Sequence, residues 1–198
     1  MGRTLDVRLS ALILSFLVAG GLVVRASAAA FSDSTDNTGN TFTAGDVVIS
    51  DDDAASSMFA VTGMEPGETD TKCINVTYSG SMDAEVRRYG AATAGDGLED
   101  FLDVTVERST DAAGGATADC TGFTEAGKSA VWTNASDGDL GAFLSGNTDY
   151  ASGADSWAVT GGGANDVASY KVIVTLQDDN GAQGLSSTVS FTWEVQNT

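Results

Sequence analysis

The sequence predicts an all-β protein: a jelly-roll-like β-sandwich with Gly- and Asp-rich loops and one short helix. Beyond the first thirty residues, no long apolar pattern of helical period occurs. Apolar and polar residues instead alternate at period two in several short segments, and Gly, Asp and Ser separate these segments. Many short strands divided by turn residues are typical of sandwiches and jelly rolls.

The first thirty residues have the pattern of a secretory signal peptide. Arg3 and Arg8 give a positive start, residues 11–24 are mostly apolar, and small residues follow up to Ala30. The apolar run is shorter than the roughly 20 residues of a membrane span, so we expect cleavage after Ala28 or Ala30 rather than an uncleaved anchor. Secretion to the cell surface or medium follows, with signal peptidase as a partner during export and no stable membrane insertion after cleavage.

Residues 31–198 have the size of one domain, and we expect a single β-sandwich there. Residues 31–41 form an extended N-terminal segment in this prediction. After Phe31 the segment contains only Ser, Asp, Thr, Asn and Gly, so it can bury little surface by itself.

The strongest strand patterns lie near the C-terminus. Segments 170–177 and 187–195 each place alternate apolar residues on one face: Tyr170, Val172, Val174 and Leu176 in the first, and Val189, Phe191, Trp193 and Val195 in the second. The polar stretch between them, with Asn180-Gly181, predicts a hairpin.

The rest of the chain gives shorter patterns. Further strands are expected at 41–49, 57–61, 73–78, 84–89 and 102–108, and loops at 110–119 and 160–166. Pro66-Gly67 predicts a type II turn. Residues 139–146 predict one helical turn around Leu140, Phe143 and Leu144.

The chain is strongly acidic. The full sequence has a net charge of −19, and removal of residues 1–30 leaves about −21. Such a surface repels phosphates and anionic lipids, so we expect no nucleic-acid partner. Solubility, for instance in a salty medium, and cation binding are both interpretations of the charge.

Cys73 and Cys120 are the only cysteines, and neither lies in a CxxC motif. In an exported chain an even pair predicts a disulfide, with free thiols or an intermolecular bridge as alternatives.

The sequence contains no histidine, which excludes Ser-His-Asp, Cys-His and HExxH sites. The acidic clusters are Asp51–Asp53, Glu99 with Asp100 and Asp103, Asp137 with Asp139, and Asp178 with Asp179. These clusters are more typical of solvated turns than of a glycoside hydrolase site, and they lack the spacing of an EF-hand calcium loop. We therefore predict no enzymatic activity, no catalytic residues and no cofactor, and leave structural calcium as the alternative.

Two stretches, "AFSDSTDNTGNTFTAGDVVIS" and "MEPGETDTKCINVTYSGSMDAEVRRY", resemble the TasA/camelysin family of secreted bacterial proteins. The shared features are an FSD start followed by N-x-F-x-A-G, and a PG turn followed by G-S-x-D-A. The resemblance covers residues 30–89. Two departures are Tyr78-Ser79, where relatives often have Asn before Gly-Ser, and the cysteine pair.

This resemblance implies a jelly roll, export through a dedicated signal peptidase, and extracellular fibres in a biofilm matrix. Some members carry a metalloprotease label, which the lack of histidine argues against here. We predict a structural subunit that polymerises head-to-tail with copies of itself. The strand-donor segment would contain Phe31, Ser32, Asp33, Asn37, Asn40 and Thr41, whose backbone would add to a neighbour's sheet. The alternatives are a monomeric adhesive or ligand-binding sandwich and a camelysin-type peptidase.

Overall fold

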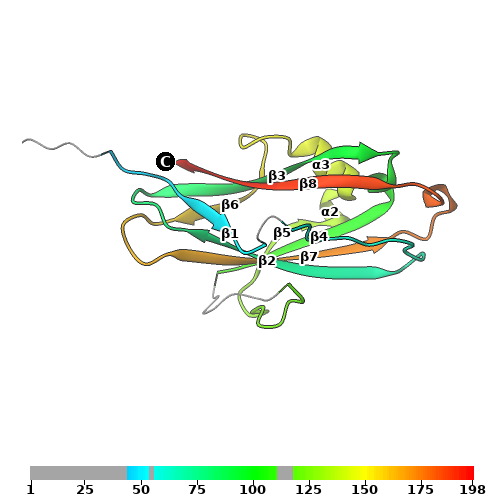
Figure 1. Ribbon diagram of the computed structural model, residues 1–198, viewed down its shortest axis with the longest axis horizontal. Coiled ribbons are helices and arrows are strands. Elements are labelled where there is room, and N and C mark those ends of the chain that lie inside the picture. Colours follow the sequence, from blue (N-terminus) through cyan, green and yellow to red (C-terminus); the bar gives the residue numbers. More distant parts are fainter. Residues whose placement is uncertain (1–43, 54–55, 111–117) are drawn as a thin grey trace, which may run out of the picture. The chain divides into compact units, whose positions relative to one another are not determined.

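The computed structural model describes residues 44–53, 56–110 and 118–198, which belong to one compact unit, Ala44–Thr198 (Figure 1). The predicted signal peptide and the segment 31–41 lie outside the described residues. The strands are β1 (Ile49–Asp51), β2 (Thr69–Tyr78), β3 (Ala84–Gly95), β4 (Leu102–Ser109), β5 (Ser129–Thr133), β6 (Ala154–Val159), β7 (Asp166–Leu176) and β8 (Ser187–Asn197). The short helices are α2 (Asn134–Asp137) and α3 (Leu140–Gly146), and 3₁₀ turns occupy Leu98–Phe101 and Asn180–Ala182.

These strands form two antiparallel sheets. The larger sheet has the order β1-β2-β7-β4-β5, and the smaller one has the order β6-β3-β8. The prediction of an all-β sandwich is confirmed, while the jelly-roll connectivity stays a prediction.

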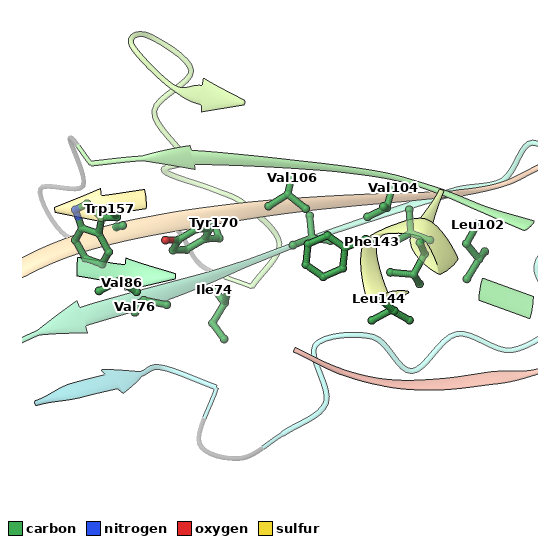
Figure 2. Close-up of a cluster of buried hydrophobic side chains, with 14 of the residues drawn as sticks. Ile74, Val76, Val86, Leu102, Val104, Val106, Phe143, Leu144, Trp157 and Tyr170 are labelled. Carbon is green, nitrogen blue, oxygen red and sulfur yellow. The ribbon is translucent and has the colours of Figure 1, made fainter. Parts of the chain in front are cut away.

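The core lies between the sheets, and α3 adds Leu140, Phe143 and Leu144 to it. The inward residues of β2, β4 and β7 alternate with outward ones, as strand geometry requires. Figure 2 shows these side chains together with Phe143 and Leu144 of α3. Asp139 caps α3 by accepting a hydrogen bond from the Ala142 N–H at 2.8 Å, which directs Phe143 into the core.

Most of the strong local patterns are confirmed. The strands predicted at 73–78, 84–89, 102–108, 170–177 and 187–195 are β2, β3, β4, β7 and β8, and the predicted helical turn is α3. The turn at Pro66-Gly67 is also confirmed, because Glu68 N–H donates to Glu65 O at 2.9 Å and Gly67 has φ +78°.

The predicted hairpin between 170–177 and 187–195 is wrong. β7 already has β2 on one side and β4 on the other, so it offers no free side to β8. The chain instead crosses to the smaller sheet through the turn at Asn180–Ala182, and β8 pairs with β3.

Two other strand predictions are largely wrong. Residues 44–48 precede the short β1, and residues 57–61 form no strand. Met58 and Phe59 nevertheless pack against the core, so their apolar character reflects burial without a hydrogen-bonded ladder. β5 and β6 were not predicted, because β5 is short and Asp155 inside β6 has a φ of +73°, which regular strands avoid.

The core of the smaller sheet contains a charge. Arg88 of β3 is 0 % exposed, and none of its three guanidinium nitrogens has a hydrogen-bond partner among the described residues. Its Cζ lies 4.7 Å from the ring centre of Phe143, 4.5 Å from Phe191 and 5.7 Å from Trp193. Cation–π contacts with aromatic faces therefore replace hydrogen bonds around this group.

A second polar contact joins the sheets beside Arg88. Asp155 of β6 accepts a hydrogen bond from the Tyr170 hydroxyl of β7 at 2.8 Å and lies 2.9 Å from Nε of Arg108 on β4. Burial lowers the pKa of Arg88 to about 10, while Tyr170 and Asp155 oppose this shift. The same burial raises the pKa of Tyr170, and the nearby Asp155 carboxylate adds to that effect.

We predict that Arg88→Lys destabilises the fold more than Arg88→Met. A lysine keeps the buried charge but loses the planar group that stacks on the rings, which should cost about 3 kcal/mol of unfolding free energy. Methionine removes the charge and keeps much of the side-chain volume. Chemical denaturation of both variants tests this, and equal losses for Lys and Met would show that only volume matters at this position.

Candidate functional site

The exposed edges of the two sheets are the candidate functional site, because an unpaired strand edge can bind another strand. Edges differ in how well they are protected. β5 and β6 are short, and each pairs with its neighbour through a register irregularity, which natural proteins use to discourage further pairing.

The outer side of β2 is covered from Cys73 to Tyr78. β1 pairs with its end from Val76 to Tyr78. Further along the strand, Cys73 N–H donates to Ala118 O at 3.1 Å and Asn75 N–H donates to Asp52 Oδ1 at 2.9 Å. These bonds occupy the amides that another strand would need.

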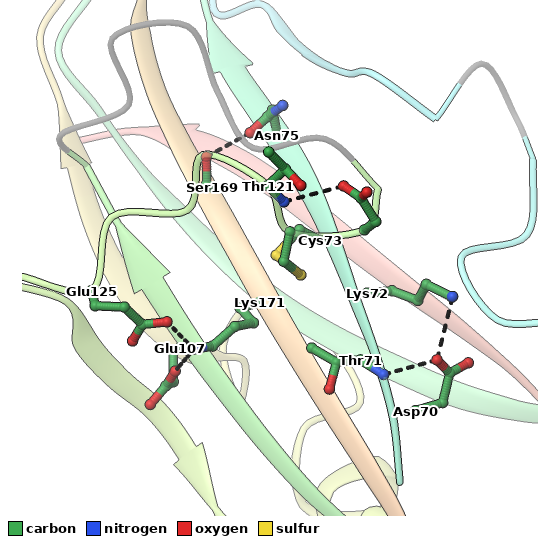
Figure 3. The surroundings of a disulfide bond; sticks show 12 residues. Asp70, Thr71, Lys72, Cys73, Asn75, Glu107, Thr121, Glu125, Ser169 and Lys171 are labelled. Carbon is green, nitrogen blue, oxygen red and sulfur yellow. Dashed lines mark hydrogen bonds and ion pairs between the residues drawn. A yellow bond between two sulfur atoms is a disulfide. The ribbon is translucent and has the colours of Figure 1, made fainter.

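A disulfide holds this cover in place (Figure 3). Cys73 of β2 is bonded to Cys120, with their Cα atoms 5.0 Å apart, as the sequence predicted. The residues after Cys120 are also attached to the outer face of the larger sheet by charge pairs. Lys171 of β7 lies 2.7 Å from Glu107 of β4 and 2.6 Å from Glu125. Disulfides are typical of oxidising compartments.

Lys128 completes a closed set of four charges. It lies 2.7 Å from Glu107 and 2.6 Å from Glu125, so each lysine contacts both glutamates. Partial burial raises the pKa of Glu107, but hydrogen bonds from Lys128 and Lys171 outweigh it and hold this pKa below its ordinary value. Lys171 also lies 4.7 Å from the ring centre of Phe123.

β8 is the longest edge strand, and no described strand pairs with its outer side. β8 has 11 residues, and its ladder with β3 keeps one register from Val189 to Asn197. Gly90, which lies opposite Phe191, donates its N–H to Asn147 O on the other side of β3. In an antiparallel pair this orientation means that Phe191, and by alternation Val189 and Trp193, direct their backbone groups away from β3.

The side chains of β8 give the edge little protection. The strand contains no Lys, Arg or Pro, and its one charged residue, Glu194, accepts a hydrogen bond from the Tyr89 hydroxyl at 2.8 Å. That bond to the carboxylate raises the pKa of Tyr89. Natural edge strands usually carry lysine, proline or a bulge against unwanted pairing, and the one register shift of the β3–β8 ladder lies at Ala92–Ala94 of β3, opposite the start of β8.

The inner face of β8 is incompletely covered. Val189, Phe191, Trp193 and Val195 pack against the core but remain partly exposed, unlike the buried residues of β7. Trp193 Nε1 and Ser187 Oγ are buried atoms without a hydrogen-bond partner among the described residues. Each such atom costs about 1–3 kcal/mol relative to a hydrogen-bonded one.

The structure does not bring the predicted acidic clusters together. Asp52 binds Asn75, Asp137 Oδ2 accepts from Thr133 N–H at 2.7 Å, and Asp179 Oδ1 accepts from Gly181 N–H at 2.7 Å. Among the described residues, no three acidic or cysteine side chains are grouped to hold a metal ion. Partial burial and the neighbouring Asp53 raise the pKa of Asp51, whereas the Thr133 bonds lower that of Asp137. Structural calcium stays a prediction.

The predicted strand-donor residues Phe31, Ser32, Asp33, Asn37, Asn40 and Thr41 lie outside the described residues. Sequence reasoning missed Arg88. Alternate residues of a strand share one face, so Arg88 lies on the same face as the apolar Ala84 and Val86, and this was the available signal. It recognised β8 as a strand but paired it with the wrong neighbour.

Within the described ranges, no helix is long and apolar enough to span a membrane.

Comparison with known proteins adds no relationship. No protein-family model matches the sequence, and no curated protein shows significant similarity to it.

We predict that Glu107→Gln lowers the unfolding free energy by about 1 kcal/mol at pH 7, because it breaks two partly buried ion pairs. The folded pKa of Glu107 is below its ordinary value of 4.5, so this stabilisation is present above pH 4.5. It is lost as the pH falls through the folded pKa.

Thermal unfolding of wild type and variant between pH 7 and 3 should therefore converge at low pH. Glu125→Gln is the matched control: it contacts the same two lysines, but its side chain is 60 % exposed, so its effect should be smaller. A Glu107→Gln deficit that stays constant down to pH 3 would contradict the pKa argument.

Proposed function

We propose that this protein is a secreted structural subunit that assembles head-to-tail into extracellular fibres. Residues 31–41 of one copy would add as a strand to the open edge of β8 in the next copy. The unprotected edge of β8 is the observation that carries this proposal. The resemblance of residues 30–89 to the TasA/camelysin family, the signal-peptide pattern and the disulfide support it.

The donor segment and the acceptor edge have compatible lengths. Residues 31–41 match the 11 residues of β8 in number. Seven residues, 42–48, connect the segment to β1 and can span at most about 25 Å when extended. This reach allows the segment to leave its own sandwich and contact another one.

Backbone hydrogen bonds would supply most of the affinity, because the donor segment has few apolar side chains. The donor and acceptor are different surfaces, so the contact repeats in one direction and generates open filaments.

We predict that a mature chain beginning at Phe42 forms no filaments under conditions where a chain beginning at Phe31 does. Negative-stain microscopy of both chains at equal concentration gives the measurement. A synthetic peptide of residues 31–41 should bind the shortened chain and raise its unfolding temperature, since it fills the open edge. Filaments of equal number and length from both chains would contradict strand donation.

We predict that Val189→Pro abolishes filaments while leaving the subunit folded. Proline removes the outward N–H of Val189 and does not disturb the ladder with β3, as expected for an edge strand. Val189→Thr is the matched control, because it loses a similar apolar contact but keeps the N–H. Normal filaments from the proline variant would exclude β8 as the acceptor edge.

A further inference from the structure

We infer that Asn134 is a site of N-linked glycosylation, an inference that rests on the proposed export of the chain. The sequence contains two N-x-S/T sequons: Asn75-Val76-Thr77 and Asn134-Ala135-Ser136. Such sequons accept glycans in secreted proteins when they lie on an accessible surface. Both asparagines are half-buried, and they differ in their hydrogen bonds and in the element that holds them.

The Asn75 sequon is held within the larger sheet. The Asn75 amide donates to Asp52 Oδ2 at 2.5 Å, and its oxygen accepts from the Ser169 hydroxyl at 2.5 Å. Its neighbours on either side, Ile74 and Val76, are buried in the core. Presentation of this asparagine to an enzyme would require β2 to leave the sheet.

The Asn134 sequon lies in a short surface helix. Asn134 begins α2, a single helical turn of 4 residues that buries none of its side chains. The Asn134 side-chain amide has no hydrogen-bond partner among the described residues. The remaining bonds are local, because Thr133 contacts Ser136 and Asp137 through their side chains. Short surface turns of this kind unfold at low cost.

The substrate class is a polyisoprenyl phosphate or pyrophosphate carrying an oligosaccharide, used by a membrane-bound transferase during export. Nδ2 of Asn134 forms a bond to the anomeric carbon of the sugar. The bond between that carbon and the phosphate oxygen breaks, the lipid phosphate leaves with the electron pair, and the amide releases one proton. No oxidant or reductant is required.

The location suggests a second effect of the glycan. Asn134 directly follows β5, which is an edge strand of the larger sheet. A bulky hydrophilic group at this position would shield the β5 edge from strand addition. It would leave the edge of β8 unaffected, because β8 belongs to the other sheet.

The test is intact-mass spectrometry and glycopeptide mapping of the chain exported by a host that glycosylates N-x-S/T sequons. A second arm replaces residues 1–30 with the host's own export signal, so that the chain reaches the transferase even if its natural leader fails. We expect one glycan, on Asn134. Asn134→Gln and Ser136→Ala should both remove it, and Asn75→Gln should leave it in place.

Unmodified Asn134 in the exported protein, or a glycan on Asn75, would overturn the inference. Filament formation is scored separately on the same samples. A glycosylated chain without filaments would contradict the proposed function and leave the glycan site established. Filaments of unmodified chain would support the proposed function and contradict the glycan site.

Discussion

The burial of the Arg88 guanidinium among aromatic rings is the constraint on which the smaller sheet depends. The guanidinium belongs to β3 and contacts one aromatic ring of α3 and two of β8, so three elements meet around one cation. Trp193 then contacts Tyr170 of β7, with ring centres 5.4 Å apart, and Tyr170 binds Asp155 of β6. A continuous set of contacts therefore links both sheets.

This arrangement also affects the candidate site. Phe191 and Trp193 are fixed on their inner side by Arg88, while their backbone groups point to the open edge of β8. An edge strand with such anchored side chains cannot easily twist away or change register, because the two rings would lose the cation. The position and register of β8 are thus set by contacts in the core and not by the edge itself.

Local sequence patterns were sufficient for the strands but not for their neighbours. Alternation at period two identified the inner faces of β7 and β8, because a strand that buries one face has apolar residues at every second position of its own sequence. The pairing of β8 with β3 depends on residues about 100 positions apart, so the Asn180-Gly181 turn gave a misleading hairpin. Asp155, with its positive φ, concealed β6. The openness of the β8 edge could not be read from β8, since it is a property of the strand order.

The Cys73–Cys120 bond has a consequence for access to the outer side of β2. It attaches to β2 the chain segment that contains Ala118, whose carbonyl occupies an edge amide of that strand. In the reduced chain, noncovalent contacts alone would hold this cover, among them the pairing of β1 with β2 and the ion pair between Lys171 and Glu125. Oxidation would therefore fix which backbone groups of the larger sheet stay closed to solvent.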